Sequence, residues 1–189
     1  MFRNAAFLLL VISITACAGR SAKSVISPEG AFDEIMKFDR FAAIQLGATK
    51  SALVASFDSF KTEMSNPTTS EETYWILRDP RTGYQKAALT FDEHTQSLVG
   101  KIWIVREGEP ERAQNVARAR FTQATFVTRD LPSRNPHLLY GDRILTDEKS
   151  GITMEISKQT DEVSSIQWYD PSYRSPARDL GDQKSQYTF

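Results

Sequence analysis

The sequence of 189 residues carries 23 lysine and arginine residues against 24 aspartate and glutamate residues, so its formal net charge is only −1. A composition of 40% hydrophobic and 25% charged residues is that of an ordinary globular protein, and the lack of a basic excess argues against a nucleic-acid partner. The single cysteine excludes a disulfide within the chain.

The N-terminal segment has the layout of an export signal. Arg3 precedes an apolar run from Ala5 to Ile14, and small residues follow it. A charged start, a short apolar middle and a small-residue cleavage region are typical of a secretory leader. The apolar run is shorter than the roughly 20 residues that a membrane-spanning helix needs. We therefore predict that residues 1–16 are a cleaved leader.

The only cysteine stands directly after this segment. The sequence Ile14-Thr15-Ala16-Cys17 resembles the lipobox of bacterial lipoproteins. The resemblance implies that a signal peptidase recognises Ile14, Thr15 and Ala16, and that Cys17 carries lipid, including palmitate, as the first residue of the mature protein. Lipidation would also remove a free thiol, which is prone to oxidation in an exported protein. The alternative is a plain leader that is cut at another bond and leaves Cys17 unmodified.

Helical signals begin after a short polar tether over residues 17–27. Ser27-Pro28-Glu29 combines a hydroxyl N-cap, a proline in the first turn and an acid near the positive end of the helix dipole. Apolar residues at helical spacing follow, and we expect Gly47 to end this helix. Thr49 then caps a second, short helix over residues 50–57.

The middle of the chain changes to strand periodicity. We predict three antiparallel strands over residues 74–77, 86–91 and 98–105. The first turn, over residues 79–83, contains a proline that presets φ and a glycine that can adopt positive φ. Residues 57–70 are expected to contain the loop that leads into this sheet.

A second run of helix and strands follows Pro110. We predict a helix over residues 111–121, a strand at 125–128 and a long loop over 131–141. Further strands are predicted over residues 143–146, 152–157 and 163–169. The polar residues 171–189 are expected to form a mobile tail.

These elements indicate an α+β fold in which short helices pack on antiparallel three-stranded meanders. The turns over residues 79–83 and 147–151 both run from aspartate to glycine, and each precedes a strand, an acidic turn and another strand. The similarity favours a duplicated helix-plus-meander unit, with one copy over residues 28–108 and a related copy over 109–170. The alternative is that hairpins in any antiparallel protein share this turn chemistry.

Part of the chain resembles a known family. Residues 44–54, Trp75 with its strand, and Gly100-Lys101-Ile102-Trp103-Ile104 are similar to the SmpA/OmlA family, which includes the small lipoprotein of the outer-membrane β-barrel assembly machinery. The duplicated arrangement resembles the β-lactamase inhibitory protein. The resemblance covers about residues 38–105 well and the second half loosely. It departs at Phe57-Asp58-Ser59-Phe60, where the family usually has Leu-Gly-x-Pro.

The sequence contains no evident catalytic constellation. His94 and His137 fall in predicted loops far apart, and the adjacent Asp92, Glu93 and His94 cannot easily converge on one metal ion. There is no glycine-rich phosphate loop, no zinc-ligand spacing and no nucleophile elbow. We therefore expect a non-enzymatic protein without a metal or a cofactor.

The leader and the resemblance together imply a lipid-anchored, periplasm-facing protein. In the resembled lipoproteins a residue other than aspartate after the cysteine, here Ala18, favours the outer membrane. The expected partners are membrane lipid, through Cys17, and a protein of the envelope, in a role accessory to outer-membrane assembly or integrity. The alternative role is that of a periplasmic inhibitor or ligand-binding lipoprotein of the β-lactamase-inhibitory-protein type.

Exposed aromatic residues on or near the strands are the natural candidates for a protein contact. We predict this contact at Trp75, Trp103, Phe57 and Phe60, or elsewhere in the loop over residues 57–70. The arginines of the second half are expected to form a solvated charged face, and the alternative is a cationic surface against anionic lipid. These arginines are Arg112, Arg118, Arg120 and Arg129.

Overall fold

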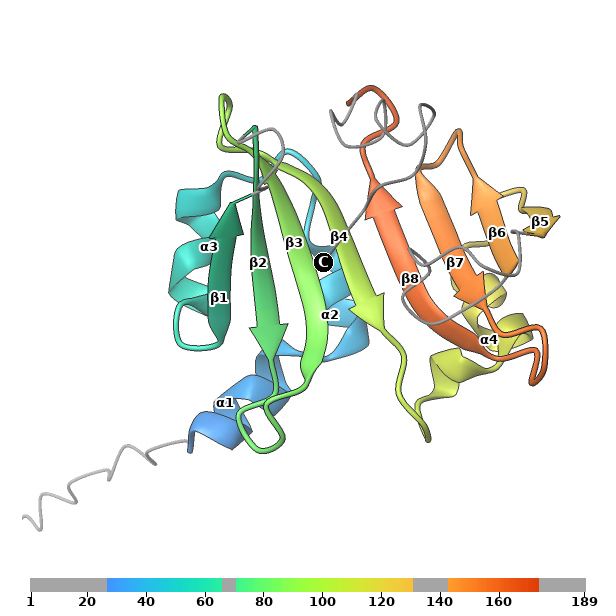
Figure 1. Ribbon diagram of the computed structural model, residues 1–189, viewed down its shortest axis with the longest axis horizontal. Coiled ribbons are helices and arrows are strands. Elements are labelled where there is room, and N and C mark those ends of the chain that lie inside the picture. Colours follow the sequence, from blue (N-terminus) through green and yellow to red (C-terminus); the bar gives the residue numbers. More distant parts are fainter. Residues whose placement is uncertain (1–26, 66–70, 131–142, 174–189) are drawn as a thin grey trace, which may run out of the picture.

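The structure, a computed structural model, describes residues 27–65, 71–130 and 143–173. These residues form one eight-stranded antiparallel sheet with short α-helices on one side (Figure 1). The α+β class expected from the sequence is therefore confirmed. The leader, Cys17, most of the tether, the loop over residues 131–141 and the tail from residue 174 onward lie outside the described residues.

The strands follow one another along the chain in two runs of four. They are β1 (Lys61–Ser65), β2 (Glu72–Arg78), β3 (Gln85–Asp92), β4 (Leu98–Ile104), β5 (Val127–Asp130), β6 (Arg143–Asp147), β7 (Ile152–Ile156) and β8 (Val163–Tyr169). The sheet order is β1-β2-β3-β4-β8-β7-β6-β5, so the last strand of each run lies at the centre. All neighbouring strands are antiparallel.

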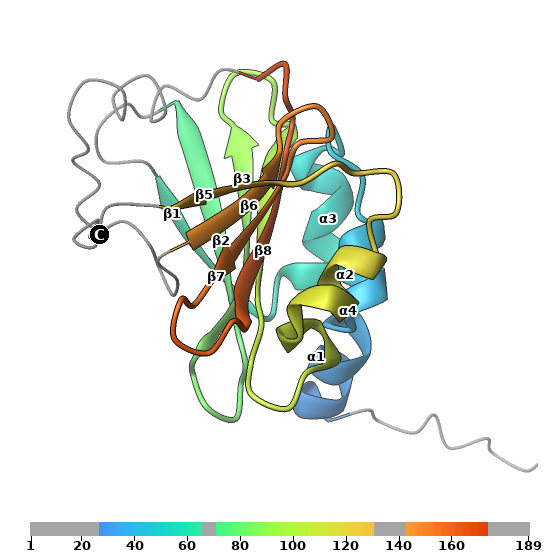
Figure 2. The ribbon, with the colours of Figure 1, turned by 90° about the vertical axis from the view of Figure 1, so that its right-hand side faces the viewer.

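The α-helices of the described part lie on the same side of the sheet (Figure 2). They are α1 (Pro28–Ile35), α2 (Phe38–Ala43), α3 (Lys50–Phe57) and α4 (Gln114–Ala119), with a 3-10 turn, η1, at Pro110–Arg112. The two predicted helix caps are confirmed. Ser27 Oγ accepts a hydrogen bond from Gly30 N at 3.1 Å, and Thr49 Oγ1 accepts one from Ala52 N at 3.3 Å.

Two predicted helices are interrupted in the structure. The first breaks at Met36 and Lys37, where the backbone ψ angles are 37° and 136°. The helix predicted over residues 111–121 is interrupted at Ala113, whose extended backbone forms a β-bridge with Glu162. Tertiary pairing overrides the local helix propensity at this second position.

One edge strand lies where the sequence predicts a loop. β1 falls within residues 57–70, and four of its five residues are exposed. Its polar sequence is typical of a sheet edge, which faces water on more than one side. The first run therefore has four strands rather than the three expected.

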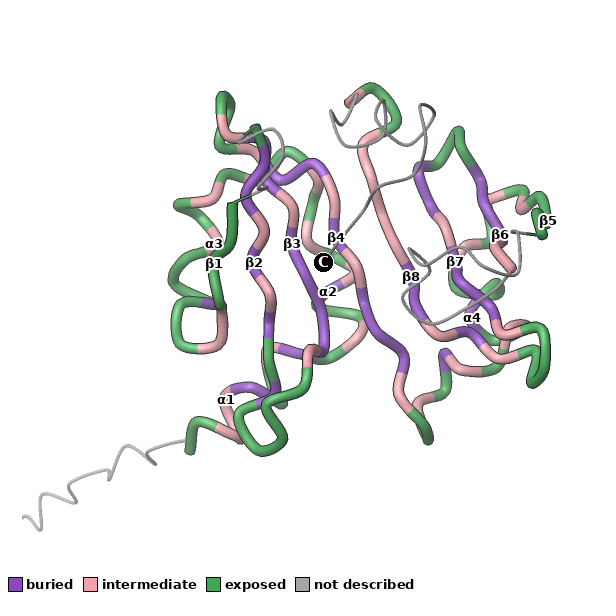
Figure 3. Tube along the Cα trace, viewed as in Figure 1, coloured by how far each residue is buried: buried purple, intermediate pink, exposed green. Residues whose placement is uncertain are grey.

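One hydrophobic core lies between the sheet and the helices, and it contains side chains from both runs of strands. Both runs carry buried residues along their strands (Figure 3). The helices contribute Phe32, Phe41 and Phe57. The largest contributions from the strands come from Trp75, Leu77, Leu89, Phe91, Trp103, Leu145, Met154, Ile156 and Ile166. The two predicted units, residues 28–108 and 109–170, therefore share one core.

The two runs of strands meet where β4 pairs with β8. Trp168 of β8 packs against α2, and its ring centroid lies 6.0 Å from that of Phe38 and 6.1 Å from that of Phe41. Phe121, which follows α4, lies 5.9 Å from the same ring. Trp168 therefore joins the second run of strands to the helices that precede the first.

Candidate interaction surface

The side of the sheet away from the helices is the candidate interaction surface. Because side chains alternate along a strand, the neighbours of the core residues point to this side. No helix or strand among the described residues lies over it (Figure 2). We call this surface the open face, and it includes Tyr74, Ile76, Ala88, Thr90, Ile102, Ile104, Ile144, Thr146, Thr153, Glu155, Ser165, Gln167 and Tyr169.

Exposure varies across this side of the sheet. Met64 of β1 and Val127 of β5, at the two edges, are exposed apolar residues. Tyr74, Ile76 and Ile102, nearer the middle, are half-buried. The surface thus carries apolar side chains that remain partly accessible, which is the kind of patch that a protein partner covers.

The aromatic residues predicted to contact a partner lie in the core instead. Trp75 and Trp103 are 1% and 2% exposed, and Phe57 is also buried. Phe60 is partly buried against Phe32, with the ring centroids 5.3 Å apart. The burial of Trp75, Trp103 and Phe57 corrects the contact predicted at these three residues, because their side chains stabilise the fold. A contact at the partly accessible Phe60 stays a prediction.

His94 lies in the exposed turn after β3, where the sequence predicts it. The neighbouring Asp92 uses its carboxylate within the turn, since Oδ1 accepts hydrogen bonds from Thr95 N at 2.6 Å and from Thr95 Oγ1 at 2.7 Å. In the described ranges, no three His, Cys, Asp or Glu side chains are placed to hold a metal ion. His137 lies outside those ranges.

Three of the four arginines predicted on a charged face pair with carboxylates. Arg112, Arg120 and Arg129 lie 3.0, 2.8 and 2.7 Å from Glu162, Glu111 and Glu148, respectively. Arg118 lies over the ring of Phe126, 6.0 Å from its centroid. Paired guanidinium groups leave little net positive charge, so this arrangement favours the solvated charged face over a cationic surface for lipid.

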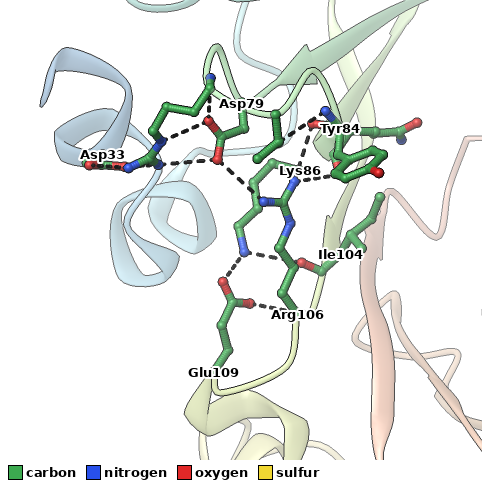
Figure 4. A network of polar contacts seen from close by, with 10 residues as sticks. Asp33, Asp79, Tyr84, Lys86, Ile104, Arg106 and Glu109 are labelled. Carbon is green, nitrogen blue, oxygen red and sulfur yellow. Dashed lines mark hydrogen bonds and ion pairs between the residues drawn. The ribbon is translucent and has the colours of Figure 1, made fainter. Parts of the chain in front are cut away.

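A polar network ties α1 to the sheet (Figure 4). Arg81, in the turn between β2 and β3, donates to Asp33 Oδ1 of α1 at 2.6 Å and to Asp79 Oδ1 at 3.0 Å. Arg106, after β4, donates to Asp79 Oδ2 at 3.4 Å. The hydrogen bonds from Arg81 lower the pKa of the buried Asp79 carboxyl, although desolvation acts in the opposite direction. The network holds the β2–β3 turn beside α1.

The sheet buries two lysines that the sequence analysis does not single out. The first, Lys86, pairs with Glu109 and donates to the carbonyl oxygen of Ile104 at 3.3 Å. Its Nζ also lies 4.1 Å from the centroid of the Trp103 ring. Desolvation lowers the pKa of Lys86, and the Glu109 carboxylate opposes this shift. The contact fastens the start of β3 to the segment after β4.

The second buried lysine, Lys101 of β4, reaches into the helix layer. Its Nζ donates to the carbonyl oxygens of Phe41 at 2.9 Å, Ala42 at 2.6 Å and Ile44 at 2.6 Å. It also lies 4.8 Å from the centroid of the Trp168 ring. Desolvation lowers the pKa of Lys101 to about 8. Lys101 thus satisfies carbonyl groups at the C-terminal end of α2 and holds that end against the junction of β4 and β8.

A second polar cluster lies at one end of the open face. Glu72 of β2 and Asp92 of β3 are buried and lie opposite each other in the register of the two strands. The Tyr74 hydroxyl donates to Glu72, and the Tyr173 side chain hydrogen-bonds with both carboxylates. Desolvation and these two carboxylates raise the pKa of the Tyr173 hydroxyl. Because Tyr173 belongs to the predicted mobile tail, the start of that tail is held in the fold.

Comparison of the chain with protein-family models, with curated proteins and with solved structures found no match. The resemblance to the SmpA/OmlA family therefore stays a prediction. No helix among the described residues is long and apolar enough to cross a membrane.

Proposed function

We propose that this protein is a lipid-anchored, non-enzymatic interaction protein of the bacterial envelope, which binds a partner protein through the open face of its sheet. The observation that carries the proposal is the asymmetry of the sheet. Helices cover one side, whereas no described element covers the other, where Tyr74, Ile76 and Ile102 remain partly accessible. An antiparallel sheet with a partly apolar side that no described helix or strand covers is well suited to contact another protein.

The anchor in this proposal is Cys17, with the leader over residues 1–16 removed and the domain facing the periplasm from the outer membrane. About ten residues separate Cys17 from the start of α1, and an extended chain of that length spans roughly 35 Å. The domain can therefore meet envelope proteins near the membrane surface while lipid holds it there. The proposed role is accessory to outer-membrane assembly or integrity.

The charged groups whose pKa values are shifted by burial or hydrogen bonding support a non-enzymatic role. Asp79, Lys86 and Lys101 are buried, and each is engaged by hydrogen bonds within the fold. These groups tie helices and turns to the sheet, rather than converging on a shared cavity.

We also propose that the fold arose by duplication of a unit with helix followed by four strands. The turns between β2 and β3 and between β6 and β7 support this idea. Asp79 Oδ1 accepts from Arg81 N at 2.9 Å, and Asp147 Oδ1 accepts from Lys149 N at 3.1 Å, so both turns have the same aspartate geometry. Each then closes on a glycine with positive φ.

Site-specific photo-cross-linking in cells tests the proposed surface. A photoreactive residue at Ile102, on the open face, should yield a specific adduct with an envelope protein. The matched control is Val54, an exposed apolar residue of α3 on the opposite side, which should yield none. Adducts from Val54 alone would assign the partner to the helix side instead.

The anchor is tested separately by palmitate labelling. The wild-type protein should take up the label and begin at Cys17, whereas Cys17→Ser should lose both properties. A mature protein that begins elsewhere would contradict the lipoprotein assignment. The alternative role, as an inhibitor or ligand-binding lipoprotein, would use the same open face, and the identity of the cross-linked partner separates the two roles.

A further inference from the structure

The most exposed large apolar side chain of the described part lies in the turn between β2 and β3. Tyr84 is 72% exposed there, and residues 80–83, which precede it, are exposed as well. A side chain this exposed contributes little to the core. Its ring is apolar and its hydroxyl is polar, which is the combination that suits a membrane–water interface or a protein contact.

A guanidinium group lies beside this tyrosine without a carboxylate partner. Arg78, also exposed, donates from Nη1 to the carbonyl oxygen of Gly83 at 3.2 Å, and within the described ranges this is the one acceptor that its side chain contacts. The nearby Arg81 and Arg106, in contrast, pair with carboxylates. Arg78 therefore has unused donors, and phosphate oxygens accept readily from a guanidinium group.

The β2–β3 turn lies at the end of the domain where the tether enters. Arg81 holds the turn beside Asp33 of α1, and α1 begins at Pro28, directly after the tether. Figure 1 shows α1 and this turn at one end of the strands and the β3–β4 turn at the other. β3 has eight residues, so about 27 Å separate its two ends. A lipid anchor at Cys17 therefore favours contact of the end that carries the β2–β3 turn with the membrane.

We propose that the β2–β3 turn, through Tyr84 and Arg78, contacts the phospholipid headgroup layer. The aromatic ring lies at the interface, and the guanidinium group donates to headgroup phosphate. The strands then run roughly along the membrane normal, so the open face looks along the membrane plane and stays accessible to a partner. This contact rests on the lipid anchor of the proposed function, and it is independent of the partner protein.

The charges around the turn nearly cancel. Arg81 and Arg106 pair with Asp33 and Asp79, which leaves little net attraction for anionic lipid. We therefore expect contact already on zwitterionic phosphatidylcholine, whose phosphate and interfacial region are sufficient for the proposed contact.

Fluorescence quenching in vesicles tests this orientation. The mature lipidated protein is placed in phosphatidylcholine vesicles that contain a lipid with a nitroxide at its headgroup. Lipid blocks the thiol of Cys17, the only cysteine of the chain, so a fluorophore can be attached to a new cysteine. Thr82→Cys reports on the β2–β3 turn, and His94→Cys, in the exposed turn at the other end of β3, is the matched control. The label at residue 82 should be quenched at least about twofold more strongly than the label at residue 94.

Substitutions of the two contact residues separate the contact from the effect of the tether alone. In the protein labelled at Thr82→Cys, Tyr84→Ala should reduce the quenching at least about twofold, and Tyr84→Trp, which keeps an amphipathic ring, should retain it. Arg78→Ala should also reduce the quenching. Val127→Ala, at an exposed apolar residue of the edge strand β5, is the control and should leave the quenching unchanged. Because all these side chains are exposed, the melting temperature should not change in any of the variants.

Equal quenching of the two labels, or unchanged quenching in Tyr84→Ala, would overturn the proposed membrane contact. A photoreactive residue at Tyr84 provides a second readout. Adducts with phospholipid are expected, and adducts with a protein instead would assign this residue to a protein contact.

Palmitate labelling of Cys17 reports on the anchor separately. A lipidated protein without preferential quenching at residue 82 would contradict the membrane contact alone, whereas a protein that takes up no palmitate would contradict the anchor and the contact together.

Discussion

The Nζ atom of Lys101 lies 2.6 Å from the carbonyl oxygen of Ile44, and none of the described groups that it contacts is a carboxylate. Carbonyl dipoles and the ring faces of Phe41 and Trp168 hold the ammonium group instead. Burial penalises the charge, so the fold favours the neutral amine more strongly than water does.

We predict that this residue makes the protein more stable as the pH rises above about 8. The pKa of Lys101 is about 8 in the fold against an ordinary value of 10.5, so the unfolded chain binds one more proton between these values. The free energy of unfolding should rise across this window by up to about 3 kcal/mol, and it should not respond to Lys101 below the window.

Urea unfolding at several pH values checks this prediction. Lys101→Met removes the titrating group and retains much of the side-chain volume. The free energy of unfolding of the wild type minus that of the variant should therefore rise from pH 8 to pH 10. The same comparison cancels the contribution of Lys86, whose pKa is also lowered. Parallel profiles for the two proteins would show that the Lys101 ammonium is hydrated.

The Asp79 network should respond in the acid range. The folded-state pKa of Asp79 is lowered, chiefly by hydrogen bonds from Arg81, so its contribution is full above the unfolded pKa and is lost as the pH falls through the folded value. Asp79→Asn should therefore cost about 1–3 kcal/mol at pH 7, and the cost should shrink below about pH 4. The control is Asp33→Asn, at an exposed partner of the same arginine, which should have a much smaller effect in chemical denaturation.

Two glycines with similar backbone angles should differ sharply in their tolerance of alanine. Gly83 and Gly151 have φ angles of 69° and 64°. A Cβ at Gly83 meets no heavy atom within 4 Å, whereas one at Gly151 would lie 2.0 Å from the carbonyl oxygen of Tyr169. Gly83→Ala should cost about 1–2 kcal/mol for the left-handed backbone alone, and Gly151→Ala should cost clearly more because the backbone has to move. The measurement is the melting temperature of each variant, which should be lower for Gly151→Ala than for Gly83→Ala. Equal melting temperatures would contradict the prediction.

The sequence predicts best what local chemistry controls. Ser27 and Thr49 cap helices as expected, and the aspartate-to-glycine turns before β3 and β7 are placed correctly, because a few adjacent residues determine each of them. The sequence does not reveal the helix break at Met36, since the apolar pattern continues through it. The sequence does not reveal β1 either, because its polar residues form a strand only through pairing with β2.

The candidate site was harder to predict because it depends on contacts between distant segments. β2 is apolar on both sides, so its sequence does not reveal that Trp75 faces the helices and Ile76 the open face. A lysine within the apolar strand β4 is the one available signal for Lys101, yet its carbonyl partners lie 57 to 60 residues away in the sequence. The pairing of β4 with β8, which joins the two runs of strands, cannot be recognised from the sequence of either strand.

A buried carboxylate in η1 pairs with an arginine just after α4. Glu111, in η1, is buried, and its Oε1 lies 2.8 Å from Nη2 of Arg120, which also pairs with Asp39 of α2. Arg120→Met would leave the Glu111 carboxylate without this partner. Because an unpaired buried charge is more costly than the absence of the pair, the variant should lose about 3 kcal/mol of stability.

A double-mutant cycle separates the charge from the packing. Glu111→Gln in the Arg120→Met background should recover part of the lost stability, because it removes the buried charge, and the coupling energy between the two positions should be about 1–3 kcal/mol. The control is Arg129→Met, which breaks the exposed pair with Glu148 and should change stability by well under about 1 kcal/mol. If the effects of Arg120→Met and Glu111→Gln on stability are additive, the ion pair contributes nothing measurable and only packing stabilises the contact between α4 and η1.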